Sequence, residues 1–545
     1  MILSQAKSLS AHSDGRFYPV VERVDLAVAA MAIIVFALIE YTYQYRHILG
    51  EPDLYRVLVG LLDGAASGRW LNSPLHYDRE FGFGYLAAIF HFVDPAVLTD
   101  PDRLIPIMNR VGLWALAPGL VCFWIAVRLA HGAMAATVAL MVFSFSPMIV
   151  ELGTSGHPSL PMFAFLSAAA LCLFLPLRGW PAILAGTVGM LLLVAGFLSR
   201  GEIFLAFPWL VLTRIDTGSL RRFVISGLLR SVPPIGAIMV FLLLQHQFVT
   251  VQMGSTIGQY IFEYFTWATV PPGIVYMAMG CGLATALLAG LAVLWLVISG
   301  LQRSNRAVLT ALLGPLALVA VPMAFFLPNP MPTRHFMLTL AGFGIVIGIL
   351  TVRRPALSRA AVYGGVAMLV IANHTLAELV RPLLLRVNDI HTPYLPTHDA
   401  YQTTTHTNIG WFWERHAALI ARRERWQDFG NKISTSCESH TLVLSDEGPH
   451  IATRLYAAGL PVKAVPFQIA GFLGARMVRD GKAFIVLEKM NGWPADPAAT
   501  VLADPTLTAY HLVQDPWTMS RYDLAPIPDD RAAKFGCATG PATGQ

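Results

Sequence analysis

Charged side chains are scarce in this sequence. Asp, Glu, Lys and Arg together make up 13% of its 545 residues, against roughly 25% in soluble globular proteins. Hydrophobic residues make up 55%, and they come in long apolar blocks. A membrane-spanning helix needs about 20 such residues in a row. The composition therefore argues against an ordinary soluble protein and predicts a polytopic α-helical membrane protein.

Cysteine is also rare, and its spacing offers no metal motif. The five cysteines form no CxxC pair and no His/Cys pattern typical of a zinc site. Cys122, Cys172 and Cys281 fall in apolar blocks, where we expect them to pack as small hydrophobic residues. Cys437 and Cys537 fall in the C-terminal region. If that region is extracytoplasmic, they either form a disulfide or remain two free thiols.

The sequence contains no basic run with interleaved aromatic residues, so nucleic acid is not an expected partner. The net charge of +5 is interpreted as arginines in membrane loops. Residues 1–23 are polar, and the first apolar block lacks an obvious small-residue cleavage site. We therefore expect a retained first helix rather than a cleaved signal peptide.

The apolar blocks predict about eleven membrane helices. We place them at 24–43, 104–129, 132–149, 158–177, 180–198, 202–213, 222–244, 273–299, 307–327, 334–351 and 358–380. The sixth is short, and it is tilted, continuous with a neighbour or re-entrant. Residues 1–23 would then be a cytoplasmic segment, 24–380 the transmembrane domain and 381–545 a separate soluble domain.

Arginines alternate with acids along the connections between these helices. With the N-terminus in the cytoplasm, the short inner connections hold ten arginines and almost no acids, as the positive-inside rule requires. These residues are Arg128, Arg178, Arg214, Arg221, Arg222, Arg303, Arg306, Arg353, Arg354 and Arg359. The first outer loop, 44–103, is rich in acids instead. An odd number of helices then leaves the C-terminal domain outside the cell.

The region after Arg381 has no block long enough to span a membrane. Segments 441–444 and 483–487 are typical of buried strands. Segment 446–459 begins with Asp and ends with Gly, as a helix does. We therefore expect 381–545 to form an extracytoplasmic α/β domain.

The first outer loop mixes acids, arginines and aromatic residues at the membrane surface. It contains GEPDLYR at 50–56 and YDREFGFGY at 77–85. One carboxylate there can accept a proton from an incoming hydroxyl. Another can hold a divalent cation that neutralises a phosphate leaving group. The alternative is that these acids are solvated loop residues.

Three further stretches follow this loop in order: SPM at 146–148 with GHPSLP at 156–161, GFLSRGE at 196–202, and PTRH at 332–335. Their order and side of the membrane resemble the GT-C class of membrane glycosyltransferases, in the group with protein O-mannosyltransferases and lipid A aminoarabinose transferases. The resemblance covers about residues 24–380. The C-terminal domain resembles no family in particular.

The resemblance implies a site in the outer loops. The family places an Asp about four residues before a Tyr; Glu51 stands at that position, and Asp53 is the nearest Asp, so either is the base. The second carboxylate is Asp78 or Glu80. The family often has Lys-Pro-Pro after the acid at this place, whereas this chain has glycines. The remaining candidates are Arg200, Arg334 and His157 for the donor phosphate and Tyr55, Tyr77 and Tyr85 as site-lining residues.

The activity implied is inverting transfer of a sugar from a polyprenyl-phosphate donor to a glycan, lipid or protein acceptor. It would take place at a bacterial plasma membrane, with the loop 245–272 over the site. Mg²⁺ or Mn²⁺ fits this chemistry without being required. Two alternatives remain: a transporter or lipid flippase, and a non-catalytic envelope assembly protein. The apolar blocks are nearly free of charged residues and the acids collect in one outer loop, which disfavours transport.

Overall fold

The computed structural model describes the helical part of the chain and three strands. The described residues are 18–43, 101–155, 157, 159–248, 267, 270–302, 306–328, 333–353, 357–389, 485–488, 511–514 and 519–523. The first outer loop and most of the C-terminal region lie outside them.

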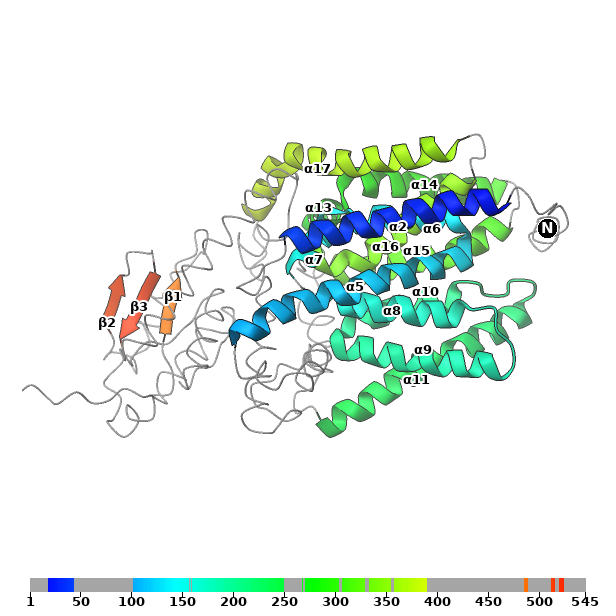
Figure 1. Cartoon of the computed structure of the whole chain (residues 1–545), viewed down its shortest axis with the longest axis horizontal. Helices are drawn as coiled ribbons and strands as arrows, with labels where there is room; N and C mark the ends of the chain where they lie inside the picture. The colour runs from blue at the N-terminus through cyan, green and yellow to red at the C-terminus, as the bar shows by residue number, and fades with distance from the viewer. Residues whose placement is uncertain are drawn as a thin grey trace, which may run out of the picture.

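The described helices pack together in one bundle (Figure 1). They are α2 (Tyr18–Tyr43), α5 (Pro101–His131), α6 (Ala133–Ser144), α7 (Pro147–Ser155), α8 (Ser159–Phe174), α9 (Trp180–Ser199), η2 (Gly201–Ala206), α10 (Phe207–Leu212), α11 (Leu220–Phe248), α13 (Val270–Cys281), α14 (Leu283–Gln302), α15 (Arg306–Phe326), η4 (Thr333–Phe336), α16 (Met337–Val352) and α17 (Arg359–Asp389).

Six of these helices are long and apolar enough to cross a membrane, and a seventh span results if α6 and α7 count as one bent pair. Three shorter apolar helices add to them, at Ser159–Phe174, Gly201–Leu212 and Met337–Val352. The chain is thus a multi-pass membrane protein, as its composition predicts. The predicted number of eleven spans stays a prediction.

Three predicted helices are not continuous in the structure. The helix predicted at 132–149 is α6 followed by α7, bent by 61° at a break before Pro147. The one predicted at 273–299 is divided into α13 and α14 at Gly282, whose φ is +89°. The short one at 202–213 begins as the 3₁₀ helix η2 and continues as α10. Glycine at 282 allows the left-handed backbone that separates α13 from α14.

Two apolar helices, α6 and α16, form the centre of the bundle. Every residue of α16 from Met337 to Ile349 is buried. Gly344 and Gly348 let its backbone approach α6 closely, since a Cβ at Gly344 would lie 2.9 Å from the Ala139 carbonyl oxygen. Small residues at such contacts are typical of membrane helix packing.

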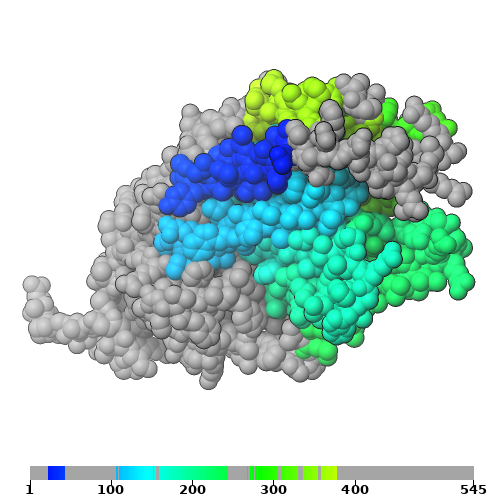
Figure 2. Space-filling view, turned by 45° about the vertical axis from the view of Figure 1, so that its right-hand side comes forward, coloured from blue at the N-terminus to red at the C-terminus, as the bar shows by residue number. Residues whose placement is uncertain are grey.

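Side chains on the outside of the bundle are large and apolar. On α9, α11 and α14, leucines such as Leu191, Leu243 and Leu291 are more than half exposed. Figure 2 shows α2, α5 and the α8–α9 pair side by side over one face. Such a surface is stable against lipid, because lipid tails solvate apolar side chains as well as the protein interior does.

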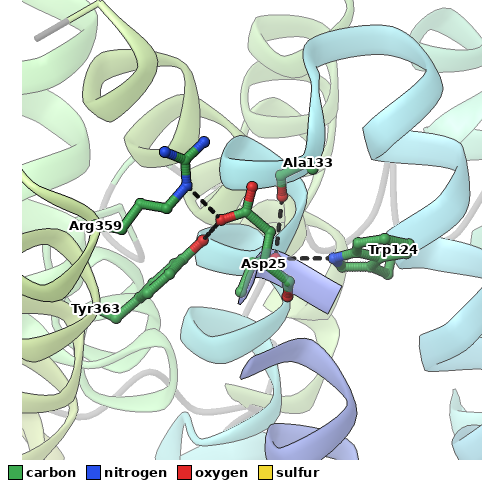
Figure 3. A network of polar contacts seen from close by, with 6 residues as sticks. Asp25, Trp124, Ala133, Arg359 and Tyr363 are labelled. Atoms are coloured by element: carbon green, nitrogen blue, oxygen red, sulfur yellow. Dashed lines mark hydrogen bonds and ion pairs between the residues drawn. The ribbon is translucent and has the colours of Figure 1, made fainter. Parts of the chain in front are cut away.

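A buried polar network joins α2, α5, α6 and α17 at one end of the bundle. Asp25 of α2 accepts hydrogen bonds from Nε of Arg359, at 2.9 Å, and from the Tyr363 hydroxyl, both on α17 (Figure 3). Thr137 of α6 donates to the Asp25 carbonyl oxygen and accepts from the Trp124 indole of α5. Helices α2 and α17 therefore start at the same end of the bundle, as the predicted topology requires.

The strands β1 (Ile485–Glu488), β2 (His511–Gln514) and β3 (Met519–Asp523) form an antiparallel sheet in the order β1-β3-β2. Ile485 pairs with Tyr522, and Val513 pairs with Arg521. β1 overlaps the strand predicted at 483–487. The predicted strand at 441–444 and helix at 446–459 lie outside the described residues, so the α/β domain and the boundaries of 381–545 stay predictions.

Candidate functional site

Three connections that are far apart in sequence meet at the end of the bundle opposite Arg359. They precede α8, follow α9 and precede α16, and they bring together His157, Arg200 and His335. The predicted topology puts all three connections on the outer side. Two of the three residues, His157 and Arg200, were predicted site residues, and the structure brings them together at this end of the bundle.

Arg200 is the centre of this cluster. Helix α9 ends at Ser199, and the extended backbone of Arg200 (φ −158°, ψ 133°) turns the chain into η2. Its guanidinium Nη1 donates to the Ser159 hydroxyl at 3.2 Å and lies 3.0 Å from His157 Nε2, while Nη2 lies 3.2 Å from Glu202 Oε1. Only 6% of its side chain is exposed. Arg200 is thus a buried residue of a polar site and not an anchor that reaches into lipid headgroups.

His157 is held in a defined orientation at the start of α8. The Ser159 amide donates to His157 Nδ1 at 3.1 Å, and the His157 carbonyl oxygen accepts from the Leu160 amide at 3.0 Å. Nε2 lies 3.0 Å from Arg200 Nη1, and a guanidinium only donates. A neutral imidazole accepts at one nitrogen only, so the Ser159 amide and the Arg200 guanidinium compete for it. An oxyanion that accepts from Arg200 would remove this competition and leave Nδ1 to the Ser159 amide.

The N-terminus of α8 adds to the positive potential at this point. Ser159 is the first residue of α8, a helix of 16 residues that runs away from the site. The first amides of a helix lack intrahelical acceptors, and the helix dipole places partial positive charge there. Helix starts with an adjacent Arg are suited to phosphate.

Glu202 and His335 complete the cluster on the other side of Arg200. Oε1 of Glu202 lies 2.6 Å from Nδ1 of His335, and the ring of Phe326 packs on the His335 imidazole with centroids 5.1 Å apart. One carboxylate oxygen thus serves both a guanidinium and an imidazole. This contact orients the guanidinium so that Nη1 points toward His157 and Ser159.

A second carboxylate, that of Glu40, is buried near the outer end of α2. It is fully buried, and neither of its oxygens has a hydrogen-bond partner within the described part of the chain. It lies against the backbone of α7 at Gly153, where any Cβ would overlap it. Gly153 precedes His157 by four residues, so Glu40 belongs to the same end of the bundle.

Most of the acids predicted for the site lie outside the described residues. These residues are the candidate bases Asp53 and Glu51, the second carboxylates Asp78 and Glu80, the lining residues Tyr55, Tyr77 and Tyr85, and the disulfide candidates Cys437 and Cys537. Arg334 lies in η4 next to His335, but its side chain is outside the described set. The roles given to these residues stay predictions.

Four site residues were not predicted. Ser159, Glu202 and His335 each stand within two residues of a predicted one, in the GHPSLP, GFLSRGE and PTRH stretches. Their proximity to His157, Arg200 and Arg334 was a usable signal. For Glu40 the signal was an acid within the apolar block 24–43, because ionisable residues in membrane helices are generally functional.

No cluster of three or more His, Cys, Asp or Glu side chains that could hold a metal ion occurs among the described residues. The described site has a guanidinium at its centre, which suits an anion and repels a divalent cation. A cation site would have to use the first-loop acids, which lie outside this part of the chain.

Over 92% of its length the chain is similar in structure to ArnT from Cupriavidus metallidurans. Its crystal structure with bound undecaprenyl phosphate gives a TM-score of 0.55 at 15% identity, covering 92% of this chain and 99% of that chain. The apo structure of the same protein gives a TM-score of 0.51 at 14% identity, with the same coverage. No protein-family profile and no curated protein sequence matches the chain.

ArnT is a lipid A aminoarabinose transferase of the GT-C class. Because the identity is low, the likeness is one of fold. It extends over the membrane region that the motifs assigned to the GT-C class, and that prediction of the fold is confirmed.

Proposed function

We propose that this chain is a membrane glycosyltransferase that moves a sugar from a polyprenyl-phosphate donor to an extracytoplasmic acceptor. The observation that carries the proposal is the buried cluster of N–H and O–H donors formed by Arg200, His157, Ser159 and the α8 N-terminus. It stands in a fold similar to that of a protein crystallised with undecaprenyl phosphate.

The chemistry of a polyprenyl-phosphate sugar explains why N–H and O–H groups would gather at this site. When the sugar leaves, its anomeric carbon loses the bond to the phosphate oxygen, and negative charge grows on the polyprenyl phosphate. Fixed donors aimed at developing charge stabilise a transition state more than the ground state. Arg200 Nη1 and His157 Nε2–H would bind this phosphate, while Glu202 keeps the guanidinium in place.

The first outer loop supplies the other half of the proposed reaction. Asp53 or Glu51 accepts the proton of the acceptor hydroxyl as its oxygen attacks the anomeric carbon from the face opposite the phosphate. The new bond therefore has inverted configuration. A divalent cation, if used, would be held by Asp78 or Glu80, where it would offset phosphate charge.

The proposed setting follows from the topology. The site faces the extracytoplasmic side of a bacterial plasma membrane, and the donor lipid lies among the helices. The acceptor is a glycan, a lipid or a protein, and it enters from the aqueous side. The C-terminal region 381–545 would bind the acceptor or a partner protein.

Transfer of labelled sugar tests the proposal directly. Purified full-length protein is incubated with a panel of polyprenyl-phosphate sugars, and labelled acceptor products are separated from donor. We expect at least one donor to be used, and Asp53→Asn or Glu51→Gln to abolish transfer while membrane insertion is normal. Normal transfer in both variants would rule out the proposed base.

A control for the phosphate-binding role of Arg200 uses an arginine at the opposite end of the helix bundle. Arg178 is exposed, and it follows α8 at the end away from Ser159. Arg178→Gln should transfer sugar at the wild-type rate, whereas Arg200→Gln should not. Equal activity of the two variants would remove the phosphate role from Arg200.

A further inference from the structure

A second cluster of basic side chains lies at the end of the bundle away from Arg200. Arg214 follows α10, Arg230 belongs to α11, and His131 is the last residue of α5. Arg214 lies within electrostatic range of both Arg230 and His131. Two guanidinium groups that repel one another are therefore held near an imidazole here, at the inner side in the predicted topology.

Arg214 adopts a backbone conformation that side chains other than glycine rarely take. Its φ is +63°, and it is the one non-glycine residue with positive φ among the described residues. Nη1 donates to the Phe174 carbonyl oxygen at the end of α8. Such strain persists only where the surrounding structure imposes it, and it is frequent at binding sites.

Arg230 is a charge within an apolar helix. It lies in the stretch Leu220–Leu243, which is long and apolar enough to span a membrane. Its Nη1 donates to the Thr213 carbonyl oxygen at 3.0 Å, which brings its guanidinium to the residue before Arg214. Arginines in membrane helices generally have a functional partner.

His131 contributes a buried ring nitrogen to the same place. Nε2 of His131 is inaccessible to solvent and has no hydrogen-bond partner within the described part of the chain. A buried polar atom without a partner is unfavourable unless something else supplies the hydrogen bond.

The connection between α10 and α11, which contains Arg214, is held by several hydrogen bonds. The Asp216 amide donates to the Ser226 hydroxyl at 3.1 Å, and the hydroxyls of Thr217 and Thr310 lie 2.9 Å apart. Asp216 Oδ1 accepts from the Gly218 amide, and no ion pair of Asp216 with Arg214 or Arg230 occurs in the described residues. The position of Arg214 is thus set by its surroundings.

Helix capping and membrane orientation explain only part of this arrangement. Each arginine gives one hydrogen bond to a carbonyl oxygen at a helix end, which is a common capping contact. A guanidinium has five N–H donors, so most donors of both side chains are left over. Arginines that only set topology can extend separately into the headgroups, and they gain nothing from lying together.

We propose that Arg214, Arg230 and His131 form an anion site that binds the phosphate headgroup of an anionic membrane lipid. A phosphate oxygen between the two guanidinium groups removes their mutual repulsion and accepts their remaining N–H donors. The Nε2 atom of His131 supplies a further hydrogen bond. A lipid is the ligand because the surrounding surface of α9 and α11 is apolar and faces the acyl chains.

The test measures lipid binding to the purified full-length protein. Phosphatidylglycerol or phosphatidylcholine is titrated, and native mass spectrometry reports the affinity for the first bound lipid. The wild type should prefer phosphatidylglycerol. Each arginine near a membrane surface contributes about fivefold to binding of an anionic headgroup, so R214Q/R230Q should weaken it roughly 25-fold. If this variant does not fold, R214Q alone should show the fivefold loss, because Arg214 is exposed.

The matched control is R178Q/R221Q, which removes the same charge from two exposed arginines at the same end. It should keep the wild-type preference. An equal loss in this control would show a general surface charge effect and overturn the proposal. Equal binding of phosphatidylcholine would also overturn it. Inorganic phosphate binding as tightly as the lipid would assign a soluble ligand instead.

Discussion

Arg200 Nη1 and His157 Nε2 lie 3.0 Å apart although the two residues are separated by 43 positions in the chain. Both nitrogens of the imidazole face an N–H group, Nε2 that of Arg200 and Nδ1 that of Ser159, and a neutral imidazole can accept from only one of them. An oxyanion that accepts from Arg200 would remove this conflict. Both predictions for the site follow from that geometry.

Arg200→Gln should lower sugar transfer about 100-fold or more, which is typical of removing a charged donor from developing negative charge. Arg200→Lys should fall between this variant and the wild type, because lysine keeps the charge but cannot contact His157, Ser159 and Glu202 together. The measurement is kcat/KM for the lipid-linked donor. If the Lys and Gln variants have equally low kcat/KM, the several N–H groups of arginine matter more than its charge.

The variants His157→Asn and His157→Gln test the contacts of the two ring nitrogens one at a time. Asn places its side-chain oxygen where Nδ1 accepts the Ser159 amide, so this variant should fold but lose the donor that faces Arg200. Gln reaches the position of Nε2 but gives up the contact to Ser159. We expect the affinity for the lipid-linked sugar to fall about tenfold in H157N, with thermal stability close to that of the wild type. Unchanged affinity in both variants would show that His157 does not contact the donor.

The sequence was sufficient to identify the long helices because membrane spans depend on apolar length alone. Breaks were harder to predict. Ser146-Pro147 ends α6 inside one apolar block, and Gly282 separates α13 from α14, yet neither interruption changes the hydropathy. The missing information is the backbone conformation of single residues, which hydropathy does not report.

The candidate site was predictable in part for a similar reason. Charge and position relative to helix ends pointed to Arg200 and His157. They did not point to the Glu202–His335 contact, because it joins two helix ends that are distant in sequence. The pairing of Asp25 with Arg359, across 334 positions, was equally invisible. Knowing on which side of the membrane a residue lies narrows the set of side chains it can contact, but the packing of the helices decides which of them meet.

Gly348→Ala should destabilise the centre of the bundle. A Cβ there would overlap the Ala135 carbonyl oxygen of α6, so α6 and α16 would have to separate. Overpacking of this kind costs about 1–3 kcal/mol. Gly364→Ala is the control, since a Cβ at Gly364 meets nothing within 4 Å. It should be neutral or stabilising by about 0.5–1 kcal/mol. The free energy of unfolding in mixed detergent micelles checks both values.

The Asp25–Arg359 pair should respond unequally to loss of its two partners. The Asp25 side chain is 2% exposed, whereas that of Arg359 is 36% exposed. Arg359→Gln leaves a buried carboxylate without its cation, which costs about 3 kcal/mol. Asp25→Asn leaves an arginine that can reach water and an acceptor for Tyr363, so it should cost about 1 kcal/mol.

The double variant D25N/R359Q completes this comparison. Because the asparagine side chain introduced by D25N carries no charge, the further loss of Arg359 should add little, and the double variant should resemble D25N alone. The same unfolding measurement in mixed micelles applies. If R359Q were as stable as the wild type, Asp25 would have to be satisfied by Tyr363 alone. The ion pair would then play no part in joining α2 to α17.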